Sequence, residues 1–466
     1  MIENLVAKRV SARELLDAHV ARCEAVNPKL NAVVATDLDR ARREAQAIDD
    51  ARARGEALGP LAGLPMTVKD CFDVDGLPSV AGNPAFADRP KACPDADVVK
   101  TARAAGAIVW GKTNVPLMAS DVQSFNAVYG TTNNPYDLAR TPGGSSGGAA
   151  AALAAHITPL EIGSDIGGSL RHPANFCGVA SLKPTWGRLS LDGHVPPPPG
   201  VRMETDLAVS GPMARDIADL RLFYDVLRGA PSPTRSIKGA RIALWTDEPE
   251  FPLAADVRAA IEDAGAALAR QGAAVTPIAA PVDVTQLMDS YFTILISIIS
   301  AGLPEPIYAA MEAARPASLE AMKAGASRYS QAGYIVASTP PYRDVAAARY
   351  VRQTLKDRVA GFFAEGWDAI LAPISTVPAF PHDHEPQQTA RRLACDGRAV
   401  EYLHILDWIA LATALHLPAV AAPVSRTRAG LPIGAQIITR WDDEARALDL
   451  AEALEREIGA LPQPAL

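Results

Sequence analysis

Apolar positions recur at helical spacing in several stretches of the chain. In residues 11–26, "SARELLDAHVARCEAV", Leu15, Leu16, Val20 and Cys23 recur at helical spacing. Ser11 is placed to cap the first turn of this helix. The same spacing predicts further helices over residues 38–54, 147–156, 215–228 and 255–271.

Short apolar runs bounded by Gly, Pro and polar residues separate these helices. They predict strands in "GLPMTVKD", "AIVW", "TPLEIG" and "RIALW", and near the C-terminus in "AILAP", "AVAAPVS" and "GAQIIT". Such alternation is typical of an α/β fold with helices on both faces of a twisted sheet. No internal repeat is visible, and "APSPTRSIKGA" at residues 230–240 is the best linker candidate.

Composition narrows the class of protein. The 466 residues are 48% hydrophobic and 21% charged, which is enough apolar material for a sizeable core. The net charge of −8 and the scattered basic residues argue against a nucleic-acid partner. The most apolar stretch, "YFTILISIISAGLP" from Tyr291, is shorter than the roughly 20 residues that span a bilayer, so we expect a buried helix and no membrane partner.

Cysteine usage suggests a compartment. The five cysteines form no C-x-x-C pair, and "MIENLVAKRV" does not read as a signal peptide. We therefore expect reduced thiols and a cytoplasmic protein.

Residues 106–113, "GAIVWGKT", match the G-x-x-x-x-G-K-T pattern of phosphate-binding loops. A true loop of this kind needs a strand before the first glycine and a helix after the lysine. Here the intervening residues are themselves an apolar strand, and Pro116 biases the residue before it away from helix. We interpret Gly111-Lys112-Thr113 as the end of a strand, which leaves a nucleotide-binding function as a rival hypothesis only.

Residues 143–147, "GGSSG", match G-x-S-x-G, the nucleophile elbow of α/β-hydrolases. An elbow needs an apolar strand that leads directly into the turn, whereas the polar "YDLARTP" precedes this one. The minor alternative is an esterase with Ser145 as nucleophile and Asp407 and His416 as its partners.

A second Gly-Ser cluster, "SDIGGSLR", offers another nucleophile in Ser169. Gly167 and Gly168 allow backbone conformations in which successive N–H groups point into one concavity that could bind an oxyanion. Ser145 and Ser146 precede an alanine-rich helix, whose N-terminal amides favour negative charge.

The base that would activate either serine is not obvious. None of the eight histidines lies within a cluster, and His172 and the "HDH" at 382–384 lack the spaced ligands of a metal site. Lys69 ends an apolar strand, and burial disfavours the charged form of an amine. A lysine that pairs with Asp70 at the strand end is the competing interpretation.

Three blocks of the sequence resemble the amidase signature family of serine hydrolases. They are "GPLAGLPMTVKDCFDVDGLPSVAG", "AGAIVWGKTNVPLMA" and the run from Gly143 to Arg188 that begins "GGSSGGAAAALAAH". The C-terminal "LPAVAAPVSRTRAGLPIGAQII" is also similar. The resemblance covers residues 11–458 and is weakest between 280 and 400.

This resemblance implies a Ser-Ser-Lys triad. The family's lysine falls on Lys69, its bridging serine, which carries a cis peptide, on Ser145, and its nucleophile on Ser169. The expected reaction is hydrolysis of a carboxylic acid amide through an acyl-enzyme on Ser169. The expected oxyanion donors are the backbone amides of Ile166, Gly167, Gly168 and Ser169.

Residues around the expected triad are assigned supporting roles. Asp165 and Arg171 are expected to hold the nucleophile loop, and Gln436 to support the fold. Ser146 and Ser164 would form hydrogen bonds around the triad. An apolar acyl pocket is expected from residues 116–126 and part of 285–345, with Met118, Tyr291, Phe292 and Ile294 as candidate lining residues.

The fold implied is one large α/β domain over residues 1–466, with a mixed central sheet of about ten strands. Residues 231–400 would form a more variable lobe that covers the active site. We expect a small-molecule amide as substrate, no metal or other cofactor, and a homodimer if the chain self-associates. The rival within the family is the glutamine-hydrolysing subunit of a tRNA-dependent amidotransferase.

Overall fold

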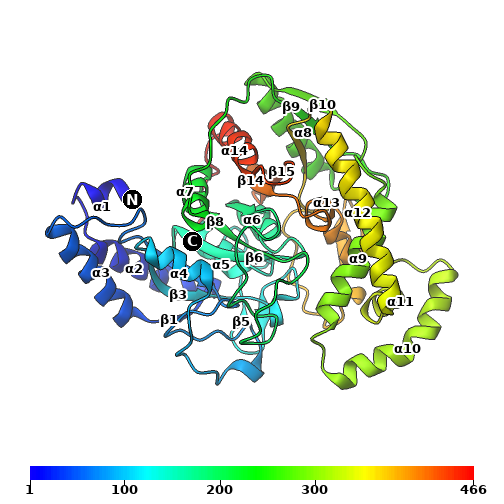
Figure 1. Cartoon of the computed structure of the whole chain (residues 1–466), viewed down its shortest axis with the longest axis horizontal. Coiled ribbons are helices and arrows are strands. Elements are labelled where there is room, and N and C mark those ends of the chain that lie inside the picture. Colours follow the sequence, from blue (N-terminus) through cyan, green and yellow to red (C-terminus); the bar gives the residue numbers. More distant parts are fainter.

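A mixed sheet of 11 strands runs through the middle of the protein, whose computed structural model describes residues 1–466 (Figure 1). In order across the sheet the strands are β1 (Val33–Thr36), β3 (Ile108–Thr113), β2 (Pro65–Lys69), β6 (Leu160–Asp165), β8 (Val209–Ala214), β7 (Ala180–Lys183), β14 (Ala419–Arg426), β15 (Pro432–Ile438), β11 (Ala369–Pro373), β9 (Arg241–Leu244) and β10 (Ala274–Pro277). The predicted fold class, an α/β protein with a mixed central sheet, is confirmed.

Parallel and antiparallel pairs occupy separate parts of this sheet. β3, β2 and β6 are parallel to one another, as are β11, β9 and β10. The strands between these groups, from β8 to β15, pair antiparallel. Two small hairpins lie outside the sheet: β4 (Phe125–Asn126) with β5 (Gly130–Thr131), and β12 (Arg392–Cys395) with β13 (Arg398–Glu401).

Helices pack on the sheet in separate groups. α5 and α6 contact each other and the central strands, and α7, α8 and α14 form another packed group on many of the same strands. The helices are α1 (Ile2–Val6), α2 (Ala12–Leu30), α3 (Leu38–Ala53), α4 (Asp97–Ala104), α5 (Gly147–Ala154), α6 (Arg171–Cys177), α7 (Ile217–Arg228), α8 (Ala255–Arg270), α9 (Val284–Ser300), α10 (Glu305–Lys323), α11 (Gln331–Ser338), α12 (Tyr342–Ala364), α13 (Ala410–Ala414) and α14 (Glu444–Ile458).

Local sequence signals explain where the first long helix begins. Ser11 caps α2 as predicted, and Glu14 completes a reciprocal capping box. The helix runs to Leu30, four residues beyond the predicted end, and continues through Pro28; Asn31 closes it in the left-handed conformation.

Helices α9–α12 gather at one side of the molecule, opposite α1–α3 in Figure 1. The apolar stretch that begins at Tyr291 lies largely in α9, which is buried on most of its length. None of the helices is both long and apolar enough to cross a membrane.

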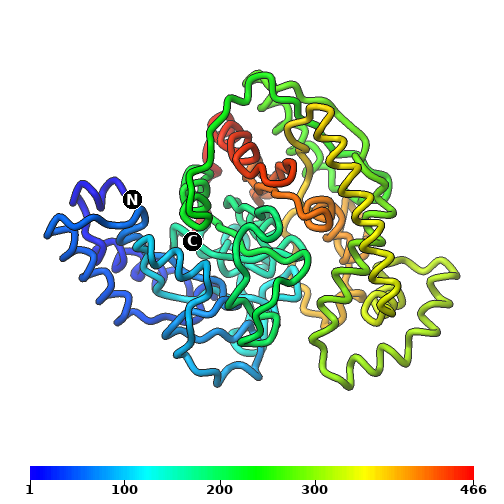
Figure 2. Tube along the Cα trace, in the orientation of Figure 1, coloured from blue at the N-terminus to red at the C-terminus, as the bar shows by residue number.

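The C-terminal tail returns to the N-terminal third of the chain (Figure 2). Leu466 packs against the small apolar core formed by α1, α2, α3 and neighbouring segments, and the Tyr136 hydroxyl donates to the carbonyl of Pro462 at 3.1 Å. The C-terminal tail therefore helps to cover the first core.

Helix α5 approaches its neighbours at backbone distance because it begins with two glycines. A Cβ on Gly148 would lie 2.3 Å from the amide nitrogen of Asn114 and 2.9 Å from the carbonyl oxygen of Ala32. No side chain fits there without moving backbone, so this glycine fixes the position of the helix that follows Ser145.

We expect Gly148→Ala to destabilise the protein by about 1–3 kcal/mol, the usual range for overpacking a close-packed site. The measurement is the melting temperature. Gly361→Ala in α12 is the matched control, because no atom lies within 4 Å of a Cβ there and alanine favours a helix. Equal melting temperatures for Gly148→Ala and wild type would contradict the packing argument.

Candidate active site

Lys69 is the last residue of β2, a strand flanked on both sides by parallel neighbours. Every residue of this strand is buried, and Lys69 itself is 0% exposed. Its Nζ lies 2.7 Å from Ser145 Oγ, 2.9 Å from Ser164 Oγ and 3.5 Å from the Ser164 carbonyl oxygen. The strand thus places the amine away from water, within hydrogen-bond distance of two hydroxyl oxygens and one carbonyl oxygen.

Burial lowers the pKa of Lys69, against the opposing charges of Cys71, Asp165 and Glu161. Two of these groups exert little net negative field. Burial raises the pKa of Glu161 to about 8, so this carboxyl is largely protonated at neutral pH, and Asp165 is neutralised by Arg171. Cys71 is the remaining opposing group, and burial outweighs it, so an uncharged amine is favoured.

Ser145 lies in an irregular loop that leads into α5, and the Gly144–Ser145 peptide bond is cis. Ser124 holds this loop from outside: its hydroxyl donates to the carbonyl of Gly143 at 3.0 Å and accepts from the amide of Gly147 at 3.1 Å. Gly144 approaches the 121–123 backbone so closely that a Cβ would lie 2.6 Å from the Asp121 carbonyl oxygen. The position of the bridging hydroxyl is therefore set by backbone packing.

The two Gly-Ser clusters form one site. The amide of Ser146 donates to the carbonyl of Ser169 at 3.2 Å, and the Ser146 hydroxyl reaches the Ser164 carbonyl at 3.4 Å. Ser169 is 6% exposed and lines a narrow cavity. The structure thus brings together Lys69, Ser145 and the Ser169 loop from three separate segments.

The nucleophile loop differs in one respect from the predicted oxyanion site. The amide of Gly168 already donates to Asp165 Oδ1 at 2.9 Å, so it is not available to an oxyanion. The amides of Ile166, Gly167 and Ser169 donate to no group of the protein. Gly168 instead allows the turn itself, since its φ is +86° and a Cβ would collide with the His172 ring at 2.3 Å.

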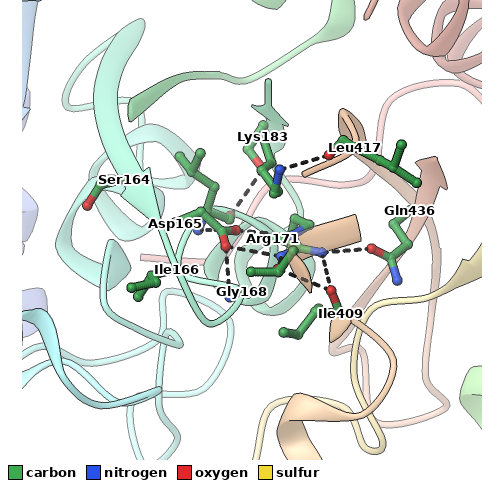
Figure 3. Close-up of polar contacts among 12 residues, drawn as sticks. Ser164, Asp165, Ile166, Gly168, Arg171, Lys183, Ile409, Leu417 and Gln436 are labelled. Carbon is green, nitrogen blue, oxygen red and sulfur yellow. Dashed lines mark hydrogen bonds and ion pairs between the residues drawn. The ribbon is translucent and has the colours of Figure 1, made fainter. Parts of the chain in front are cut away.

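Asp165 and Arg171 form a fully buried ion pair with two hydrogen bonds, each 3.0 Å long. Figure 3 shows Arg171 between Asp165 on one side and Ile409 and Gln436 on the other. Its remaining N–H groups donate to the carbonyl of Ile409 at 3.0 Å, to Gln436 Oε1 at 3.1 Å and to Thr413 Oγ1 at 2.6 Å. The pair joins the nucleophile loop to strand β15 and helix α13.

Asp165 also accepts from two amides of the loop, those of Gly168 and, at 3.1 Å, Leu170. Burial alone would raise the pKa of Asp165, but Arg171, Lys183 and the Gly168 amide together hold it well below the usual range. The carboxylate is therefore ionised at neutral pH and holds the loop in shape.

The cavity beside Ser169 has a volume of about 50 Å³. Its walls are mainly apolar: Ala119, Val122, Ile166, Leu295, Ile296, Ile299, Tyr334, Leu403, Ile405 and Leu406 contribute, together with Gly167, Ser169, Ser120, Asp121 and Gln388. Asp121, its one charged residue, is already held by Arg391 at 2.7 Å and by the Tyr402 hydroxyl at 2.9 Å.

The candidate pocket residues Met118 and Tyr291 lie elsewhere. Tyr291 is fully buried behind the cavity, where its hydroxyl donates to the carbonyl of Ile166 at 3.2 Å. Met118 is half-buried with its sulfur beside Asn83. Residues 119–122 and α9 supply walls of this cavity, whereas Met118 and Tyr291 do not line it.

The rejected motifs do not form the sites that their patterns suggest. Lys112 is buried within β3, which continues through Gly111 to Thr113, and its amine donates to the Phe72 carbonyl and to Ser79 Oγ. Asp407 pairs with His404 at 2.7 Å, whereas His416 pairs with Asp206 at 2.8 Å. The esterase triad is therefore wrong, because neither residue approaches Ser145.

Sequence reasoning missed His194 and Cys71 beside the site. His194 Nε2 lies 2.8 Å from Ser164 Oγ and 3.2 Å from Cys71 Sγ. Cys71 follows Lys69 closely, but His194 lies in the Pro-rich loop, and no periodicity or motif of that loop signals a contact with the triad.

Comparison with known proteins agrees with this geometry. A family model described as Amidase matches residues 14–448. The chain is 33% identical over 501 aligned positions to one of the subunits of glutamyl-tRNA(Gln) amidotransferase from Anaeromyxobacter sp. (strain K), and the match covers 99% of this chain and 96% of that protein. It is 43% identical over 233 positions, half of each chain, to the AtzE subunit of 1-carboxybiuret hydrolase from Pseudomonas sp. (strain ADP).

A solved structure gives the same result. A bacterial aryl acylamidase of the amidase signature family superposes with a TM-score of 0.80 at 25% identity, over 98% of this chain and 94% of that one. The fold and the site thus define an enzyme that acts on C–N bonds. The chain belongs to the amidase signature family.

We expect Asp165→Asn to destabilise the protein by about 3–5 kcal/mol, because it leaves the Arg171 guanidinium buried without a counter-charge. The pKa of Asp165 is lowered in the folded state, so its stabilisation is present above about pH 4, the unfolded value, and is lost as the pH falls.

The measurement is the melting temperature of both proteins between pH 3 and pH 7. The variant should lose the most at neutral pH and approach wild type in acid. Glu320→Gln, in an exposed ion pair with Lys323, is the control and should melt like wild type throughout. A constant difference at every pH would contradict the assignment.

Proposed function

We propose that this enzyme hydrolyses carboxylic acid amides through an acyl-enzyme on Ser169, with Lys69 and Ser145 as the proton relay. The observation that carries the proposal is the 2.7 Å contact between a fully buried lysine amine and the Ser145 hydroxyl, beside a loop with three unpartnered amides. A serine becomes nucleophilic only when a base accepts its proton, and an uncharged lysine can do so.

The proposed reaction begins with proton transfer along this relay. Uncharged Lys69 accepts the hydroxyl proton of Ser145, and Ser145 takes the proton of Ser169 as Ser169 Oγ bonds to the amide carbon. The negative charge that develops on the carbonyl oxygen is held by the amides of Ile166, Gly167 and Ser169. Collapse breaks the C–N bond, and the proton returns from Lys69 through Ser145 to the leaving nitrogen. Water then attacks the acyl-enzyme by the same relay and releases the acid.

The walls of the cavity support an apolar acyl group on a linear amide. Glutamine would need counter-groups for its ammonium and carboxylate, and the single charged side chain of the cavity, Asp121, is already occupied by Arg391 and Tyr402. We therefore favour a stand-alone amidase over the glutamine-hydrolysing component of an amidotransferase, although relatives over the whole chain carry the amidotransferase name.

Residues 231–400 act as the covering lobe in this proposal. Leu295, Ile296 and Ile299 of α9 and Tyr334 of α11 supply one wall of the cavity beside Ser169. The substrate is a small molecule in the cytoplasm, and no nucleic acid or membrane takes part. A homodimer stays a prediction, which sedimentation or size-exclusion chromatography would test.

We expect Lys69→Met to lower kcat by about 100- to 10,000-fold, the usual contribution of a positioned base. The variant keeps the length and burial of the side chain and removes only the amine. The readout is single-turnover hydrolysis together with labelling by a fluorophosphonate, which should modify Ser169 in wild type and nothing in Ser169→Ala.

Lys112→Met is the matched control, because Lys112 is equally buried at the end of the neighbouring strand but contacts neither serine. Its folded fraction should turn over like wild type. Labelling of Ser145 in place of Ser169, or full activity in Lys69→Met, would refute the relay.

We expect kcat/KM to rise about fourfold for each methylene added to a straight-chain acyl group until the cavity is full, since burying a methylene is worth about 0.8 kcal/mol. Glutamine should be hydrolysed more slowly than an uncharged amide of similar length. The measurement is a panel of primary amides, anilides and glutamine. Glutaminase activity that arises only with an added partner protein would favour the amidotransferase role.

A further inference from the structure

A buried chain of hydrogen bonds continues from Lys69 away from the reacting serines. Ser164 Oγ lies 2.9 Å from Lys69 Nζ and 2.8 Å from His194 Nε2, and His194 Nδ1 lies 2.7 Å from the carbonyl oxygen of Pro196. Figure 3 shows the Ser164 side chain pointing away from Arg171. Ser164 and the Asp165–Arg171 ion pair therefore lie on opposite sides of the backbone. The proposed relay assigns no role to His194.

The Pro196 carbonyl determines which ring nitrogen of His194 carries hydrogen. A carbonyl oxygen can only accept, so Nδ1 must be the N–H, and in the neutral ring Nε2 is then a lone pair. The partner of Nε2 must donate to it. Ser164 is therefore the donor in the contact with His194, and its oxygen is left to accept from Lys69.

This direction matters to Lys69, because an uncharged amine has two N–H groups and one lone pair. The Ser164 carbonyl and the Ser164 hydroxyl oxygen each accept one N–H. The remaining direction, toward Ser145 at 2.7 Å, then holds the lone pair. Without an acceptor at Nε2 the Ser164 hydroxyl could turn and donate to Lys69, which would occupy the lone pair that Ser145 needs.

We propose that His194 is a positioning residue for amide hydrolysis: through the hydroxyl of Ser164 it directs the lone pair of Lys69 at Ser145. The inference rests on the proposed relay. No atom is transferred to His194, which acts by accepting one hydrogen bond throughout the cycle.

Cys71 is the competing partner of His194. Its Sγ lies 3.2 Å from Nε2 and 3.8 Å from Ser164 Oγ. If His194 served Cys71 rather than Ser164, removal of the thiol would have the same effect as removal of the imidazole.

The test is a double-mutant cycle between His194 and Ser164. His194→Phe keeps a ring without an acceptor, and His194→Gln offers an oxygen near the position of Nε2. We expect His194→Phe to lower kcat about 10- to 100-fold, the range for partners that orient a directly acting side chain, and His194→Gln to restore part of it. In a Ser164→Ala background His194→Phe should have no further effect.

The pH profile supplies a readout that a general loss of packing would not reproduce. In His194→Phe, a protonated Lys69 has no lone pair, so the Ser164 hydroxyl would have no acceptor for its hydrogen. The protonated amine is therefore disfavoured, and the pKa of Lys69 should fall. The acid limb of the kcat/KM profile reports the protonation of Lys69, whose charged neighbours are Cys71, Glu161 and Asp165. This limb should shift to lower pH, and the plateau value of kcat/KM should decrease. If the substitution only loosened the packing and let water in, water would stabilise the protonated amine and the acid limb would shift to higher pH.

Controls separate this inference from the relay itself. Wild type must hydrolyse the amide, and Lys69→Met must lose activity. If either result is not obtained, the proposed relay is refuted independently of the role of His194. His384→Phe, at an exposed histidine that stacks on Phe125, should behave like wild type. Three results would each overturn the proposal. The effects of the His194 and Ser164 substitutions could be additive, the acid limb could be absent in both His194 variants, or Cys71→Ala could lose as much activity as His194→Phe.

Discussion

The burial of one amine organises the centre of this protein. Lys69 is carried out of water by a strand whose residues are all buried, and burial lowers its pKa. Three groups could stabilise a charged amine there, but Glu161 has its pKa raised to about 8 and Asp165 is bound to Arg171, which leaves Cys71 alone against the effect of burial. The oxygens around Lys69 are hydroxyl and carbonyl oxygens, which suit an uncharged nitrogen as well as a charged one.

The second constraint is the buried ion pair that holds the nucleophile loop. Asp165 accepts two loop amides, and Arg171 extends the network to Gln436 and Ile409. Gln436 in turn donates to the carbonyls of Pro373 and Trp408, at 2.7 and 2.6 Å. Segments far apart in the sequence are thereby tied to the loop that carries Ser169, so the C-terminal half of the chain contributes to the geometry of the site.

The sequence could predict those parts of the site that depend on residue type and local pattern. The α/β alternation and the segments that hold Lys69, Ser145 and Ser169 are of this kind. The engagement of the Gly168 amide depends on where the Asp165 side chain turns, which no pattern encodes. His194 was beyond reach for a similar reason, since its contact with Ser164 is made across 30 positions by an irregular loop.

The order of residues at the end of β6 explains how the two constraints coexist. Successive side chains of a strand point to opposite faces, so Ser164 faces Lys69 while Asp165 faces Arg171. One residue step thus separates the contact with the buried amine from a fully charged pair. Because Arg171 lies 3.0 Å from Asp165, that carboxylate can hold the loop while its stabilisation of a proton on the amine is weakened. The ion pair therefore fixes the loop that carries Ser169 and adds little net charge beside Lys69.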